Sequence, residues 1–143
     1  MTAGSGIRHS EFNPSATEEL RLLQIWFIPN KPGLTPSYEQ KKFSHEDEQN
    51  KFLKVVSGAK EDGVIFINQD AIIYLSDLDK SKQINHQVSP KRGVYVHVIE
   101  GATNVNGQSL NGGDAAKLTE EKEIIISAET DSKIILFDMT MDF

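Results

Sequence analysis

A chain of 143 residues has the usual length of one domain, and its content of 38% hydrophobic and 25% charged residues is typical of a globular protein rather than of a disordered or membrane-embedded one. The net charge of −6, from 15 basic and 21 acidic residues, and the scattered placement of the basic residues argue against a nucleic-acid partner. The apolar runs are far shorter than the roughly 20 residues that cross a bilayer, which argues against a membrane partner, and the absence of cysteine and of a secretory leader indicates a cytoplasmic protein.

The first motif of the chain is GIRHSEFNPS, residues 6–15, which contains His9 and Glu11. In a strand the two side chains would point to the same face. Imidazole and carboxylate groups suit iron, manganese, nickel, copper or zinc, but a catalytic site usually takes three protein ligands. The chain has neither a His-x-His pair nor an HExxH motif, so the pattern by itself is half of a metal site or two surface residues.

Two segments of different character follow. LRLLQIWFIP, residues 20–29, is a nearly continuous apolar run, which predicts a buried strand that ends at Pro29. Residues 30–40 are rich in proline and glycine, which predicts an extended connector. The acidic stretch SHEDEQN, residues 44–50, predicts a helical turn with Ser44 as its N-cap.

From residue 51 onward, short strand-like segments recur between turn residues. Their spacing of about 8 to 12 residues predicts an antiparallel β-sandwich or barrel. In GVYVHVIEG, alternation places Val94, Val96 and Val98 on one face of a strand. Asn106-Gly107 predicts a two-residue hairpin turn, because both residues readily take positive φ angles. The predicted strand-like segments are FLKVV, GVIFIN, DAIIYLSDL, KQINHQV, GVYVHVIEG, ATNVNGQSL with its hairpin turn, KEIIISAE and KIILFDMT.

The remaining histidines give no ligand pattern of their own. His45 lies among polar residues and is expected to be exposed, and His86 is expected to be a solvated histidine near a turn. His97 lies within a predicted strand, where a hydrogen bond within the sheet is the expected role. The basic pair Lys91 and Arg92 lies between Pro90 and Gly93 and is expected to form a solvated turn.

The order of these motifs is similar to that of a known family. TAGSGIRHSEFN, then LLQIWFIPNKPGLTPSYEQKKF, then the strand-rich half that ends in KIILFDMTM resemble the pirin family of bicupin proteins, in the bacterial branch with quercetinase-like members. The resemblance covers essentially the whole chain. It implies an all-β fold, a cupin (jelly-roll-like) antiparallel β-sandwich or barrel with an N-terminal strand arm.

The same resemblance assigns roles to the first motif. The family's first cupin holds one metal through three histidines and a glutamate, and His9 and Glu11 match the last histidine and the glutamate of that set. The implied cofactor is a divalent transition metal, with iron as the expected metal. This chain alone is not expected to bind it, because the His-x-His pair is missing. The chain is therefore expected to begin partway through a family sequence. Residues 1–40 would be remnant strands and linker of the first cupin, and residues 41–143 a C-terminal cupin without a metal set of its own.

Three functions remain open at this point. The chain is a pirin-like C-terminal cupin without catalytic activity alone, or one part of a metal-dependent quercetin 2,3-dioxygenase-like enzyme completed by another chain, or a protein-interaction module. The first 35 residues would leave an unpaired edge and an apolar stripe, which predicts a homodimer through the arm or contact with a missing N-terminal cupin. The interface candidates are Leu22, Ile25, Trp26 and Ile28.

Overall fold

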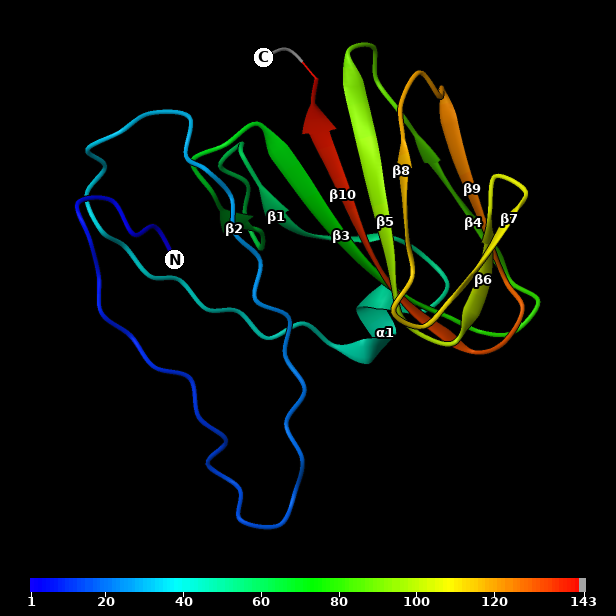
Figure 1. Ribbon diagram of the computed structural model, residues 1–143, viewed down its shortest axis with the longest axis horizontal. Helices are drawn as coiled ribbons and strands as arrows, with labels where there is room; N and C mark the ends of the chain where they lie inside the picture. Colours follow the sequence, from blue (N-terminus) through cyan, green and yellow to red (C-terminus); the bar gives the residue numbers. More distant parts are fainter. Residues whose placement is uncertain (142–143) are drawn as a thin grey trace.

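A computed structural model describes residues 1–141, in which two facing β-sheets stand beside an irregular N-terminal segment (Figure 1). The strands are β1 (Leu53–Ser57), β2 (Ile65–Phe66), β3 (Ala71–Leu78), β4 (Gln83–Gln87), β5 (Arg92–Glu100), β6 (Ala102–Val105), β7 (Gln108–Asn111), β8 (Ala115–Leu118), β9 (Glu123–Ala128) and β10 (Ser132–Thr140). One sheet has the order β2-β1-β3-β10-β5-β8 and the other β4-β9-β6-β7. All pairs are antiparallel except β1 with β2. The predicted all-β sandwich is confirmed.

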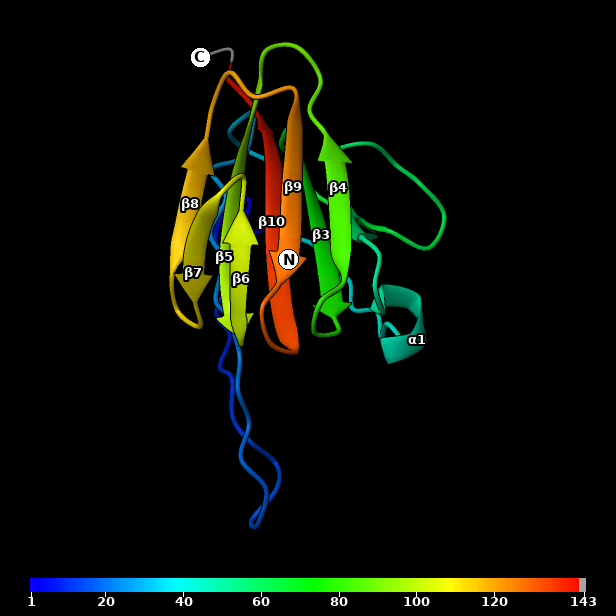
Figure 2. The same cartoon turned by 90° about the vertical axis from the view of Figure 1, so that its right-hand side faces the viewer.

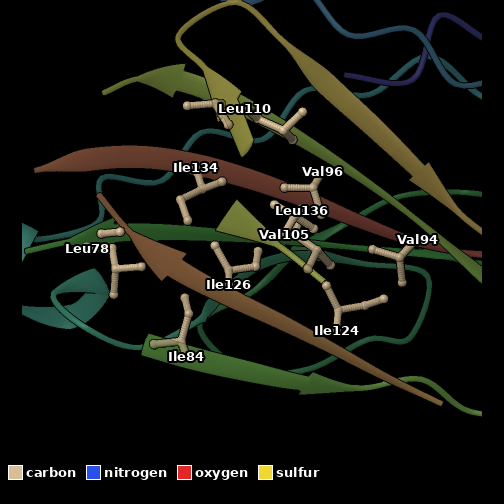
Figure 3. Close-up of a cluster of buried hydrophobic side chains, with 12 residues drawn as sticks. Leu78, Ile84, Val94, Val96, Val105, Leu110, Ile124, Ile126, Ile134 and Leu136 are labelled. Atoms are coloured by element: carbon tan, nitrogen blue, oxygen red, sulfur yellow. The ribbon is translucent and has the colours of Figure 1, made fainter. Parts of the chain in front are cut away.

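The main core lies between the two sheets and follows from the alternation of the strands. Val94, Val96 and Val98 of β5 are buried on one face, as predicted, and Leu136 of β10 and Ile126 of β9 have no exposed surface. Figure 3 shows side chains from both sheets pointing into this shared layer. Each fully buried side chain of this size stabilises the fold by about 1.5–3 kcal/mol.

Turn chemistry positions the four-stranded sheet. Asn106 and Gly107 have φ angles of 46° and 92°, and they join β6 to β7 in the predicted hairpin. Positive φ at both central residues matches the right-handed twist of the paired strands. Strand β8 was not predicted, because its sequence AAKL has only a weak alternation, and its position depends on pairing with β5.

A second apolar cluster covers the outer face of the six-stranded sheet. Ile73 of β3 and Ile135 and Phe137 of β10 point away from the sandwich interior, and Phe27 and Phe43 pack against this cluster from the N-terminal segment. The rings of Phe27 and Phe137 lie 6.1 Å apart. The outer face is therefore partly covered by residues that precede the sandwich in sequence.

We call residues 1–44 the N-terminal arm. The arm contains no regular strand, only a two-residue bridge between Thr2 and Ser37. Figures 1 and 2 show that its blue part extends beyond the end of the sandwich. The prediction of a buried strand at residues 20–29 was wrong, because a strand needs a neighbour for its backbone groups and this segment has no strand partner among the described residues. Asn30, whose N–H donates to the carbonyl of Asn68, fixes the end of the segment.

The arm ends at the one short helix of the described chain, α1 (His45–Glu48), as the acidic stretch predicted. Ser44 occupies the N-cap position, but its hydroxyl donates to the carboxylate of Asp47 rather than capping a backbone N–H. No helix among residues 1–141 is long and apolar enough to cross a membrane.

Candidate functional site

The predicted half-site lies in the arm. His9 Nε2 is 3.2 Å from Glu11 Oε1, so the structure brings the two side chains into contact. Their side chains are 37% and 47% exposed. Gln24 donates a 3.4 Å hydrogen bond to the other carboxylate oxygen of Glu11, which connects the pair to the returning part of the arm.

The pair has the donor types of a metal site but not the number. No third histidine, aspartate or glutamate within residues 1–141 completes a compact three-ligand set around His9 and Glu11. A transition metal needs its charge and its coordination shell satisfied together, and two exposed donors do not meet that requirement. The described residues therefore fit half of a metal centre, and no catalytic step can be assigned to this half alone.

A second group of polar side chains lies inside the sandwich, at one end. His86 comes from β4, Asp138 from β10 and Arg92 from the start of β5, so three strands and both sheets contribute. His86 Nε2 lies 2.7 Å from Asp138 Oδ2, and Arg92 Nε donates to Asp138 Oδ1. We call these three residues the interior network. The exposed fractions of their side chains are 10% for His86, 6% for Asp138 and 16% for Arg92.

Aromatic rings and a further carboxylate surround the interior network. The rings of Tyr74 and Phe52 lie 5.1 and 5.9 Å from that of His86. Burial by itself would raise the pKa of Asp138, but hydrogen bonds from His86 and Arg92 outweigh it, so the pKa of this carboxyl lies below its usual value. Arg92 also donates to Asp70 at 2.7 Å. The carboxylate of Asp138 is thus satisfied by hydrogen bonds from both neighbours.

The interior network corrects two predictions. His86 was expected to be solvated and Arg92 to lie in a solvated turn, yet both side chains are largely buried. The sequence near them looks like a turn, but the alternation of β4 points His86 inward together with Ile84, and Asp138 lies 46 positions from Arg92. In this structure His86 Nε2 is engaged by the carboxylate of Asp138.

The other two histidines lie on outer faces of the fold. His45 is 64% exposed, as predicted. His97 is paired with Ile135 in the ladder of β5 and β10 but makes no side-chain hydrogen bond to the described residues, so the expected bond within the sheet is absent.

The predicted interface residues of the arm are all exposed. The exposed fractions are 56% for Leu22, 42% for Ile25, 84% for Trp26 and 85% for Ile28. Large apolar side chains gathered on an exposed segment are a common mark of an interaction surface. That these residues form an interface stays a prediction.

Comparison with known proteins identifies related sequences on both sides of residue 40. A family model described as the quercetinase C-terminal cupin domain matches residues 54–139, and one described as pirin matches residues 1–27. Quercetin 2,3-dioxygenase of Escherichia coli strain K12 is 42% identical over 139 residues, which are 97% of this chain and 59% of that protein. A pirin-like protein of Caulobacter vibrioides is 34% identical over 139 residues, 96% of this chain and 60% of that protein. The chain therefore spans about three fifths of these relatives' length.

Solved structures resemble the fold as well. The crystal structure of YhhW from Escherichia coli superposes with a TM-score of 0.75 at 32% identity, over 80% of this chain and 47% of that one. The structure of the bacterial pirin YhhW in complex with nickel(II) gives a TM-score of 0.72 at 32% identity, over 78% of this chain and 47% of that one. The sequence comparison and the structural comparison therefore point to the same family and the same β-sandwich fold.

Proposed function

The chain belongs to the pirin family, in its quercetinase-like branch, and on that basis we propose that it supplies part of a quercetin 2,3-dioxygenase-like metalloenzyme. In this proposal residues 41–143 are the C-terminal cupin, and the arm contributes two ligands, His9 and Glu11. Two further histidine ligands come from a polypeptide segment outside the 143 residues. Without that segment the chain has no catalytic activity.

The observation that carries the proposal is the contact between His9 and Glu11, which lie in the region that matches the pirin model. The pair offers two donor groups of the types that bind transition metals, but no third ligand among the described residues completes the set. A divalent metal bound there would hold and polarise an oxygen of the substrate. Glu11 would serve as a ligand or accept a proton from a phenolic hydroxyl group, since a carboxylate can do either. Iron is the expected metal, and the nickel(II) complex of YhhW supports a metal of this class.

The interior network supports a proposal in which the arm supplies metal ligands and the second cupin does not. It satisfies His86 and Asp138 internally and leaves neither free for catalysis. Under this proposal the second cupin is a rigid support for the arm. Phe27 and Phe43 anchor the arm to the outer face of the six-stranded sheet.

The test combines metal content with quercetin turnover. The chain is purified alone and after mixing with the region of the Escherichia coli relative that it does not match, each with iron(II) or nickel(II). We expect almost no metal and no turnover for the chain alone, and about one metal per complex with turnover for the mixture. His9→Ala and Glu11→Gln should abolish both, whereas His97→Ala and Glu19→Gln should abolish neither. Full metal loading of the chain alone, or loading of the complex that survives His9→Ala, would contradict the proposal.

A role in protein interaction is favoured by one further observation, the exposure of Trp26 and Ile28 at 84% and 85%. We propose that these side chains pack against the same ligand-bearing segment. The double variant Trp26→Ser/Ile28→Ser should weaken that complex, measured by sedimentation, whereas Ile125→Ser on the other sheet should not. If the double variant forms a complex of unchanged stability, this role is refuted. If the chain instead forms a dimer that excludes the ligand-bearing segment, the surface around Trp26 and Ile28 is a homodimer interface.

A further inference from the structure

A second set of metal-ligating side chains lies where the arm joins the sandwich. His45 and Glu48 are three positions apart on α1, so they lie on the same face of that helical turn. Asp77 lies on β3, next to α1. The N–H of Asn50 donates to the carbonyl of Asp77 at 2.7 Å, which holds the end of α1 against β3. The backbone therefore brings Asp77 close to two side chains that lie about 30 positions earlier in the sequence.

The donor atoms of this set form a compact group. The ligand atoms of His45, Glu48 and Asp77 all lie within 4.8 Å of one another, and His45 Nδ1 is 2.5 Å from Asp77 Oδ2. The side chain of Asp77 is 13% exposed, and His45 is open to solvent. One imidazole and two carboxylates thus lie close together at a position that solvent can reach.

The charge of this group is only partly balanced. Lys133 Nζ lies 3.5 Å from Asp77 Oδ2, whereas no described residue donates a hydrogen bond to the carboxylate of Glu48. A carboxylate without a donor, beside a second carboxylate, is a position where an added cation would be favourable.

We propose that His45, Glu48 and Asp77 bind a divalent transition metal ion of the zinc type, with a water molecule as fourth ligand. The site is distinct from the half-site at His9 and Glu11 and lies on the second cupin. Nitrogen and oxygen donors in this number suit Zn²⁺.

To accept the ion, the three side chains would have to change their spacing. Two donors at about 2.1 Å from zinc, in a tetrahedral arrangement, lie roughly 3.4 Å apart. The contact between His45 and Asp77 would open from 2.5 Å, and the other two separations, which are at most 4.8 Å, would adjust to the same spacing. Lys133 would turn away from Asp77, because its ammonium group competes with the metal for the same carboxylate.

Metal binding would link the end of the arm to the six-stranded sheet. Since α1 directly follows the arm, a metal shared by α1 and β3 would fasten the last residues of the arm to the six-stranded sheet. Binding to the folded state alone would also raise the midpoint of thermal unfolding.

The test is calorimetric titration of the full 143-residue chain with zinc chloride. We expect one bound zinc, an affinity that falls about tenfold or more in both His45→Ala and Glu48→Gln, and an affinity that rises in Lys133→Gln. His9→Ala is the matched control and should leave the affinity unchanged. Because His45 is exposed, its substitution should leave the fold intact, which circular dichroism checks.

A second measurement follows the thermal midpoint with and without zinc. The midpoint should rise in the parent chain and stay unchanged in His45→Ala. No zinc binding by the parent chain, or binding that His9→Ala removes and His45→Ala does not, would overturn the site.

Discussion

The carboxylate of Asp138 is the side chain on which the interior network depends. It accepts from His86 Nε2 at 2.7 Å and from Arg92 Nε, and only 6% of its side chain is exposed. Asp138→Ala removes both interactions at once. It leaves Arg92 with Asp70 as its remaining carboxylate partner and leaves His86 without one.

Two estimates of the resulting loss agree. Hydrogen bonds to charged groups contribute about 1.5–3 kcal/mol each, so two of them amount to about 3–6 kcal/mol. Removing one partner of a buried ion pair costs about 3–5 kcal/mol, because the other charge stays buried. We therefore expect Asp138→Ala to lower the free energy of unfolding by about 3–5 kcal/mol, a large part of the roughly 5–15 kcal/mol of a typical domain.

The assay is urea unfolding followed by far-ultraviolet circular dichroism. Fluorescence of Trp26 is a poor substitute, because this residue is 84% exposed in the arm and does not report on the core. Asp62→Ala is the matched control, since Asp62 is exposed and has no partner among the described residues, and it should change stability by less than about 0.5 kcal/mol.

A loss of less than about 1 kcal/mol in Asp138→Ala would refute the reasoning, because it would mean that the buried charges do not depend on each other. The double variant Arg92→Met/Asp138→Leu gives an independent check. Replacing both charges with apolar groups leaves no unpaired ion, so it should recover about half or more of the loss.

Three further predictions follow from the described contacts. The pKa of Asp138 is lower in the folded state than in the unfolded state. The stability advantage of the parent chain over Asp138→Asn should therefore be full above about pH 5 and should fall as the pH drops through about 4 and below. Urea unfolding across this pH range measures the advantage, and an advantage that grows on acidification would contradict the prediction. Gly101→Ala and Gly107→Ala both place a side chain at positive φ, but of the two only Gly101 would bring the new Cβ within 2.3 Å of a backbone carbonyl oxygen. Thermal unfolding should therefore show a loss of stability of about 1–2 kcal/mol for Gly107→Ala and a larger loss for Gly101→Ala. Equal losses would argue against the clash at Gly101. The variant His9→Ala/Glu11→Ala should barely change the stability of residues 40–143, because both side chains are exposed in the arm, and a loss above about 2 kcal/mol in urea unfolding would show that the arm carries part of the core.

Local pattern was enough to predict most of the sandwich. The alternation in GVYVHVIEG placed Val94 and Val96 in the core, because successive side chains of any strand point to opposite faces. Asn106-Gly107 predicted the hairpin for an equally local reason, the positive φ angles that its turn requires. The motif order predicted the pirin family, and the family comparisons confirm it.

Partners distant in sequence decided the rest. The apolar run at residues 20–29 was read as a buried strand, but burial and strand pairing both need a second surface, which a local pattern does not specify. Strand β8 exists because β5 offers it a free edge.

The sequence by itself indicated most strands of the sandwich and the Asn106-Gly107 turn, and it placed His9 and Glu11 two positions apart, because these features depend on side-chain type and on spacing of a few positions. Only the tertiary structure decided that His86 meets Asp138, 52 positions away, and that His45 meets Asp77, 32 positions away. The physical reason is that charge pairing and desolvation depend on distance in space, and that distance is set by how the two sheets and the short helix pack.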